Sequence, residues 1–173
     1  GKGDVASVGV RVVAGRVPAL AAQRLAGLVG GQARAVAIVV DGNRHYDDAL
    51  LELCDTLEQQ GFGVVGAGAF IARHSIAGDI GAGRPDDNDK RELAAFMDGV
   101  KKALERPAGA PAPAVPGSRP YKEAPPSKRP ILVSEACTEC GLCSRECPAG
   151  AIQPEDTKLT DLDACISCMR CVQ

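Results

Sequence analysis

The spacing of the cysteines constrains this chain more than any other feature. Seven of its eight cysteines lie in the last 37 residues, and they form two triplets with the spacing C-x2-C-x2-C. The first triplet continues to a fourth cysteine and a proline, as Cys137-x2-Cys140-x2-Cys143-x3-Cys147-Pro148. This run is typical of bacterial-type proteins with [4Fe-4S] clusters, in which the fourth cysteine binds the other cluster of a pair.

The two triplets predict two cubane clusters with crossed ligands. Three thiolates at this spacing on a tight turn can bind three irons of one cubane, and the backbone amides of the turn can point at the sulfurs. Gly141 lets the backbone bend inside the turn. We expect Cys147 to complete the cluster of the second triplet, Cys165, Cys168 and Cys171. The other cluster has three thiolates in this sequence, and its fourth is expected four residues beyond Cys171, outside the sequence given. Short strands at 151–152 and 158–162 are expected to pack over the clusters.

Other uses of cysteine fit this pattern less well. Structural zinc takes cysteine pairs or Cys/His pairs in a tetrahedron, which triplets without a nearby histidine do not supply. A Rieske centre needs two histidine ligands, and His45 and His74 lie far from the triplets. Disulfide frameworks belong mostly to small secreted chains, so a clustered set favours metal ligation in a reducing compartment, here the cytoplasm. Cys54 lies apart from the rest and is predicted to be a buried structural thiol on a helix.

Composition divides the chain into three segments. Residues 1–106 have the periodicity of a folded domain, residues 107–130 hold eight of the twelve prolines, and residues 131–173 hold the triplets. The middle segment has almost nothing to bury and is predicted to be a semi-rigid extended linker. The net charge of −2 argues against a nucleic-acid binder, and no apolar stretch of about 18 residues predicts a membrane helix.

The first segment alternates strand and helix patterns. Apolar runs predict buried strands at 5–13, 35–40 and 62–71. Amphipathic patterns with end signals predict helices at 18–29, 46–60 and 86–105, the last of them capped by Asp86–Asp89. The alternation predicts a parallel sheet with right-handed crossovers. Because three strands are few for such a sheet, we expect further strands of this domain before Gly1. His74 lies in a glycine-rich connection and is expected to be a solvated loop residue.

Motifs in both halves resemble one protein family. The first segment contains, in order, Gly15-Arg16-Val17-Pro18, the stretch GNRHYDDA at 42–49, Gly66–Ile71 and Gly83–Asp86, and the cysteine-rich segment contains CISCMRC. They are similar to the flavodoxin/ferredoxin fusion proteins of anaerobic prokaryotes, over nearly the whole chain. The resemblance implies an α/β flavodoxin-like parallel sheet with strand order 2-1-3-4-5 and an incomplete N-terminus. It also implies a small α+β bacterial ferredoxin-like domain.

The resemblance further implies an FMN site at the carboxyl ends of the strands. The loops that would flank the flavin ring contain Val13, Ala14 and Gly15 after the first strand, and Asn43 and Tyr46 after the second. Asn43 can equally be a turn residue, and Tyr46 can simply close the entry of a helix. The first strand and its phosphate loop, which bind the FMN phosphate in such a domain, are absent from the sequence given.

These observations favour an electron carrier over an enzyme. One-electron transfer through the clusters, to and from redox partner proteins, needs no acid or base. The seven acidic side chains of residues 131–173 could steer a basic partner. The alternatives are an FMN oxidoreductase whose clusters feed a flavin that reduces a small molecule or quinone, and a scaffold domain that docks the ferredoxin domain as a subunit of a larger complex.

Overall fold

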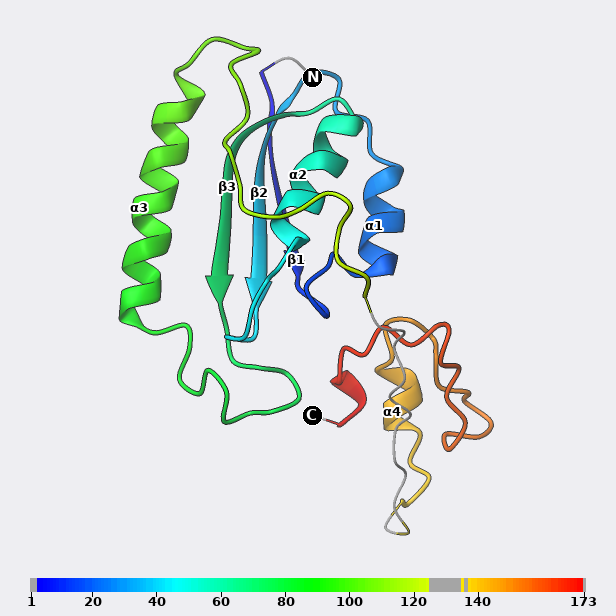
Figure 1. The fold of residues 1–173 in the computed structure, drawn as a ribbon. Coiled ribbons are helices and arrows are strands. Elements are labelled where there is room, and N and C mark those ends of the chain that lie inside the picture. The colour runs from blue at the N-terminus through cyan, green and yellow to red at the C-terminus, as the bar shows by residue number, and fades with distance from the viewer. Residues whose placement is uncertain (1–2, 125–134, 136, 173) are drawn as a thin grey trace. The chain divides into compact units, whose positions relative to one another are not determined.

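The first half of the molecule is a parallel sheet between two layers of helices (Figure 1). The structure, a computed structural model, describes residues 3–124, 135 and 137–172 and consists of two compact units, 1–124 and 125–173. In the first unit, β1 (Val5–Arg11), β2 (Arg34–Asp41) and β3 (Gly63–Ile71) form a sheet of order β1-β2-β3 with parallel pairing. Helices α1 (Ala19–Ala26) and α2 (Ala49–Gln59) cover one face, and α3 (Asp87–Leu104) covers the other. The predicted parallel α/β sheet is confirmed.

The core lies between the middle strand and α2. Ala35, Ala37 and Val39 of β2 have no exposed surface, and neither have Leu53 and Leu57 of α2. Small side chains on the strand let the helix approach closely, so that the leucines bury most of the apolar area. Strand β2 has a neighbouring strand on each side and is covered on both faces, which explains why its sequence is almost continuously apolar.

Strand β1 is less buried than its sequence predicts. Its residues alternate between exposed and half-buried, and Val5 is 49% exposed. Val8 and Val10 pack on the core, while β1 pairs with β2 alone among the strands that the structure describes. The strand also ends at Arg11, before Val13. Val13 instead pairs with Arg16 across a two-residue turn, where Ala14 and Gly15 have φ of +52° and +81°.

Two helices are shorter than their patterns predict. Helix α1 ends at Ala26 rather than 29, with Gly27 as its cap. Helix α2 begins at Ala49 rather than 46, because Asp47 has a φ of +42° and Asp48 is the N-cap residue. The backbone N–H of Asp48 donates to the carbonyl of Gly15 at 3.1 Å, so the turn after β1 holds the chain before α2 out of the helix.

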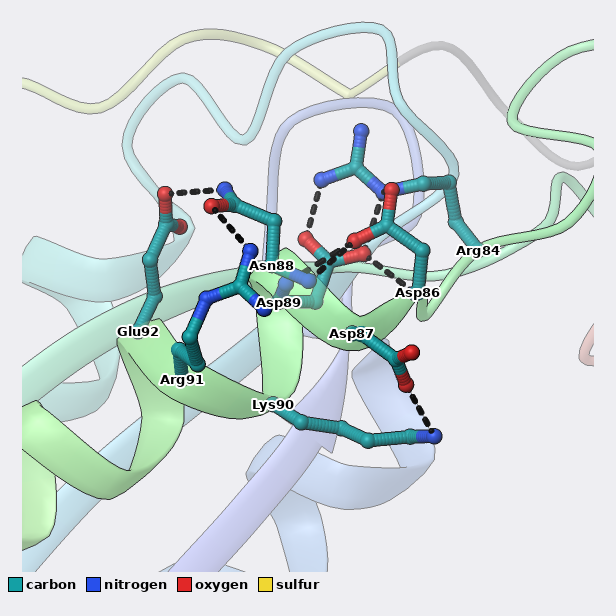
Figure 2. Close-up of polar contacts among 8 residues, drawn as sticks. All are labelled: Arg84, Asp86, Asp87, Asn88, Asp89, Lys90, Arg91 and Glu92. Atoms are coloured by element: carbon teal, nitrogen blue, oxygen red, sulfur yellow. Dashed lines mark hydrogen bonds and ion pairs between the residues drawn. The ribbon is translucent and has the colours of Figure 1, made fainter.

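The start of α3 is held by a capping box (Figure 2). The Asp86 side chain accepts from the N–H groups of Asn88 and Asp89, and the Asp89 carboxylate accepts from the N–H of Asp86 at 2.7 Å. The Arg84 guanidinium pairs with both oxygens of Asp89, which lowers the pKa of that carboxyl to about 2. Reciprocal bonds of this kind satisfy donors that a helix start leaves free, as the sequence signal at 86–89 predicts.

Part of the proline-rich segment packs on the α/β sheet domain and is not only a linker between the two domains. Residues 116–122, which we call the strap, cross α2, and Val115 before them packs on the core (Figure 1). A side chain at Gly117 would collide with Leu51 of α2, since its Cβ would lie 2.8 Å from the Leu51 Cβ. The expectation of a segment with almost nothing to bury therefore does not describe the strap, because Gly117 lets its backbone approach α2 and its N–H groups bond to Asp48.

The second unit has little regular structure. It contains the four-residue helix α4 (Leu142–Arg145) and the 3-10 helix η1 (Arg170–Val172). The strands expected at 151–152 and 158–162 are reduced to one antiparallel bridge between Ile152 and Thr160. Ala151 and Ile152 are buried. In the part of the chain that the structure describes, no helix is both long and apolar enough to cross a membrane.

Candidate functional site

The two cysteine triplets adopt the same backbone conformation. The residue two positions after the first cysteine has a positive φ in both triplets, Glu139 at +56° and Ser167 at +51°. The residue after the second cysteine does so too, Gly141 at +70° and Met169 at +64°. In each triplet a short helix starts at the next residue, as α4 and as η1. Since only the first triplet has a glycine at this position, the shared conformation comes from the cysteine spacing rather than from one residue type.

Backbone N–H groups point at the sulfurs of the first run. The N–H of Glu139 lies 3.4 Å from Sγ of Cys137, and that of Ala151 lies 3.2 Å from Sγ of Cys147. The N–H of Leu142 donates to the Cys140 thiol and is the largest cause that lowers its pKa. Such donors stabilise thiolates, the form that binds iron. The sequence predicted amides aimed at the sulfurs, and the geometry fits a cluster.

Cys147 lies within electrostatic reach of the second triplet. Burial raises the pKa of the Cys171 thiol, and the charges of Cys168, Cys147 and Cys165 raise it further. Arg170 links the same region by donating to Glu146 from Nε at 2.9 Å and from Nη2 at 2.7 Å, which ties η1 to the end of α4.

The thiols are not gathered around a single point. Among the described residues, no three His, Cys, Asp or Glu side chains are placed to hold one metal ion. A single zinc ion needs its ligands within about 2.3 Å of one centre. A cubane instead binds each thiolate through a different iron, so its ligands stand further apart. The assignment of the seven cysteines therefore depends on their spacing, shared backbone and N–H donors.

Cys54 is not part of this site. Its side chain lies in the core beside Leu50, Leu53 and Leu57, and the residue is 5% exposed. Burial raises the pKa of its thiol to about 11. A thiol that stays protonated is a poor metal ligand, so the structure supports the predicted structural role.

Only some of the residues predicted to flank a flavin line a common cavity. A cavity of about 370 Å³ lies at the carboxyl ends of the strands and is lined by Ala14 and Gly15 among others. Asn43 and Val13 do not line it, and Tyr46 packs on the core and lines a separate cavity beneath the strap. Gly15 is required by the protein itself, because a Cβ there would lie 2.1 Å from Oδ2 of Asp47.

His74 lines this cavity, which the sequence analysis did not foresee. It is half-buried, and its ring packs against Gly42 at the end of β2. Arg44, His45, Asp47 and Lys122 are further lining residues. The sequence signal was the stretch GNRHYDDA itself, which supplies three of these lining residues. Nothing in the periodicity linked that stretch to His74, because the two meet only when β2 and β3 pair.

Comparison with known proteins agrees with the cysteine pattern. Residues 129–173 match the family of 4Fe-4S dicluster domains. Searches of curated proteins and of solved structures gave no match to the chain. The matched range contains all seven clustered cysteines and none of the first unit. The chain therefore has a C-terminal 4Fe-4S dicluster domain that follows an N-terminal parallel α/β domain.

Proposed function

We propose that this protein carries single electrons between redox partner proteins through two [4Fe-4S] clusters. The observation that supports this most directly is the repeated backbone of the two cysteine triplets, inside a range that matches dicluster domains. The proposed ligands are Cys165, Cys168, Cys171 and Cys147 for one cluster. Cys137, Cys140 and Cys143 are proposed for the other.

The residues of this chain hold the clusters and adjust their charge. When bound, such clusters accept and release one electron at a time, with potentials set by hydrogen bonds to the sulfurs and by solvent exposure. The N–H groups of Glu139, Leu142 and Ala151 are donors of that kind. Most of the cysteines are half-buried, and Cys140 is exposed. Exposed ligands favour exchange with a partner, because electron transfer needs close approach.

The surface charge of the second unit favours a basic partner. Residues 131–173 have seven acidic and three basic side chains. Among them, Glu155 and Asp163 are exposed and in no ion pair within the described part of the chain. Opposite charges on two proteins speed their encounter and make the rate fall with salt. We therefore infer docking on a positively charged redox protein.

Anaerobic spectroscopy tests the proposal on the whole chain. After reconstitution with iron and sulfide, absorption should show broad iron–sulfur charge-transfer bands, and reduction by dithionite should give the EPR signals of [4Fe-4S]⁺ centres. Cys54→Ala is the matched control, since Cys54 is buried in the core of the first unit. Its spectra should equal those of the unaltered chain. Tight binding of one zinc ion in place of iron and sulfide would contradict the proposal.

A second candidate is a flavin enzyme fed by the clusters. We infer that the sheet is flavodoxin-like, because it is parallel, three-stranded in sequential order and covered by helices on both faces. The cavity at the carboxyl ends of its strands lies where ligands bind in such sheets. Of the five residues predicted to contact FMN, only Ala14 and Gly15 line this cavity. The fit to a flavin ring is therefore partial.

Flavin titration separates the two candidates. Addition of FMN to the whole chain should quench flavin fluorescence saturably if the flavin enzyme is correct, and turnover should then require a small-molecule acceptor. The electron carrier predicts full cluster reduction and reoxidation without added flavin. Ala14→Trp would block the cavity and should abolish any flavin binding without changing the EPR signals.

A further inference from the structure

The imidazole of His74 is held in one tautomer. Its Nδ1 accepts hydrogen bonds from the N–H groups of Ile76 at 3.1 Å and Ala77 at 3.0 Å. A ring nitrogen that accepts from backbone donors carries no hydrogen, so the neutral ring has its hydrogen on Nε2. Among the described residues, Nε2 has no hydrogen-bond partner. The tautomer therefore leaves one free donor on a residue that lines the cavity.

The backbone fixes the position of this ring as well as its tautomer. A Cβ at residue 42 would lie 2.7 Å from Cδ2 of His74 and 3.0 Å from its Cα, so only glycine allows this approach. The N–H of His74 donates to the carbonyl of Ile80 at 3.0 Å. Packing on Gly42 and three hydrogen bonds thus hold the ring before any ligand arrives. A donor held in advance loses little conformational freedom on binding.

The carboxylates that line the cavity have hydrogen-bond partners, but one guanidinium that lines it does not. Both carboxylates that line it already accept hydrogen bonds: Asp41 from the N–H of Arg44 at 3.1 Å, and Asp47 from Nζ of Lys122 at 2.7 Å. The Arg44 guanidinium, in contrast, has no hydrogen-bond or ion-pair partner among the described residues. Nε2–H of His74 and the guanidinium of Arg44 are therefore unsatisfied donors of this cavity, and together they match an oxyanion.

We propose that this cavity binds a small-molecule oxyanion, a carboxylate or a phosphate group, through Nε2–H of His74 and the guanidinium of Arg44. The volume of about 370 Å³ lies in the range of small-molecule sites, roughly 300–1,000 Å³. The small residues Ala14, Gly15 and Gly42 leave room for the ligand. The site is separate from the cysteine triplets and goes beyond electron transfer by the clusters.

Histidine NMR tests the proposal on the whole chain, because its only two histidines, His45 and His74, both line the cavity. Long-range ¹H–¹⁵N spectra should show His74 with its hydrogen on Nε2. Separate titrations with inorganic phosphate and acetate should shift the imidazole signals saturably. Tighter binding of phosphate would identify a phosphate ester as the source of the oxyanion, and tighter binding of acetate would identify a carboxylate.

Variants separate the donor from the fold. His74→Asn keeps an acceptor for the N–H groups of Ile76 and Ala77 but removes the Nε2–H donor, so the anion should bind about tenfold more weakly. Arg44→Gln changes an exposed side chain and should weaken binding by a similar factor. Arg91→Gln, the same substitution on the exposed face of α3, is the matched control and should leave the affinity unchanged.

Four outcomes would overturn the proposal. The first is an Nδ1–H tautomer, and the second is the absence of a saturable shift with either anion. The third is equal anion affinity in Arg44→Gln and Arg91→Gln. The fourth is saturable binding of riboflavin that prevents both anions from binding. Riboflavin has no oxyanion, so this result would show that the cavity takes a flavin ring instead.

Discussion

Asp55 on α2 holds Arg119 of the strap by two hydrogen bonds, from Nε at 2.8 Å and from Nη2 at 2.5 Å, across 64 residues of sequence. The hydroxyl of Tyr121 donates to the same carboxylate at 2.5 Å. The Arg119 bond is the largest cause that lowers the pKa of Asp55, while burial and the bond to Asp55 raise that of Tyr121 to about 12. The carboxylate is thus one anchor of the strap.

Two further acids on the same face of α2 complete the anchor. Asp48 accepts from the N–H groups of Ser118 at 2.8 Å and Lys122 at 2.7 Å. Glu52 pairs with the Arg16 guanidinium, which also donates to the carbonyl of Lys122. Asp48, Glu52 and Asp55 stand four and three residues apart, on one side of the helix. The strap therefore supplies hydrogen-bond donors to Asp48 and Asp55, and its Lys122 carbonyl accepts from the partner of Glu52.

Asp55→Ala should loosen the strap. Loss of the partner of Arg119 and Tyr121 should destabilise the first unit by about 1 kcal/mol, since the Arg119 end of the pair is exposed to solvent. Hydrogen exchange at the amides of Ser118 and Lys122 should become faster. Asp98→Ala breaks an exposed pair with Lys101 on α3 and is the control. Unchanged amide exchange in Asp55→Ala would show that the strap does not depend on this carboxylate.

Removal of Arg84 should destabilise the start of α3 at neutral pH and reduce the dependence of its stability on acid. The folded-state pKa of Asp89, about 2, is below the ordinary value of 3.8, mainly because of Arg84. The stability from this carboxylate is therefore full above 3.8 and is lost as the pH falls toward 2. In Arg84→Gln the pKa of Asp89 should rise toward 3.8, so the variant should be less stable than the unaltered chain above that pH and should lose less stability between pH 3.8 and 2.

Carboxyl ¹³C titration measures that shift directly. The matched control is Lys90→Gln, which removes an exposed partner of Asp87 on the same helical turn. It should leave the titration of Asp89 where it is. An Asp89 pKa that does not move in Arg84→Gln would contradict the role given to the guanidinium.

Equivalent substitutions in the two triplets should have unequal effects on the clusters. If Cys147 completes the second cluster, then within the 173 residues given Cys143→Ala leaves that four-thiolate cluster intact, whereas Cys171→Ala leaves two sets of three thiolates. Mössbauer spectra should therefore show a stable [4Fe-4S] centre in Cys143→Ala. They should show only labile or three-iron centres in Cys171→Ala. The opposite result would mean that Cys147 binds with its own triplet.

Glycine at position 169 should adopt the left-handed backbone conformation at a lower free-energy cost than methionine. A left-handed conformation costs a residue with a Cβ about 1–2 kcal/mol, and Met169 has a φ of +64° where Gly141 has +70°. Met169→Gly should slow cluster loss to an iron chelator, by about fivefold if roughly 1 kcal/mol is gained. Gly141→Ala should speed it by a similar factor. Equal rates in all three proteins would show that these dihedral angles do not limit cluster stability.

Sequence patterns predicted the features that depend on near neighbours. The spacing Cys137-x2-Cys140-x2-Cys143 indicated a turn with amides facing sulfur, because both the ligands and the donors lie within a few residues. The Asp86–Asp89 capping box was visible for the same reason. The alternation of apolar and polar residues predicted three strands and three helices, with errors at their ends. The end of β1 and the start of α2 were misplaced, since Gly15 and Asp47 contact each other across the fold.

Only the tertiary structure decided what the proline-rich segment and His74 do. Composition treated residues 107–130 as a linker, because proline and alanine have little to bury. The strap is held by Asp48 and Asp55, which lie more than 60 residues before it. His74 was expected to be solvated, yet Gly42, just after the end of β2, packs against its ring at a cavity. Contacts over such separations form only when strands pair and helices pack, so a local sequence pattern cannot predict them. The cysteine spacing could be interpreted from sequence because the ligands of one cluster lie within a few residues of each other.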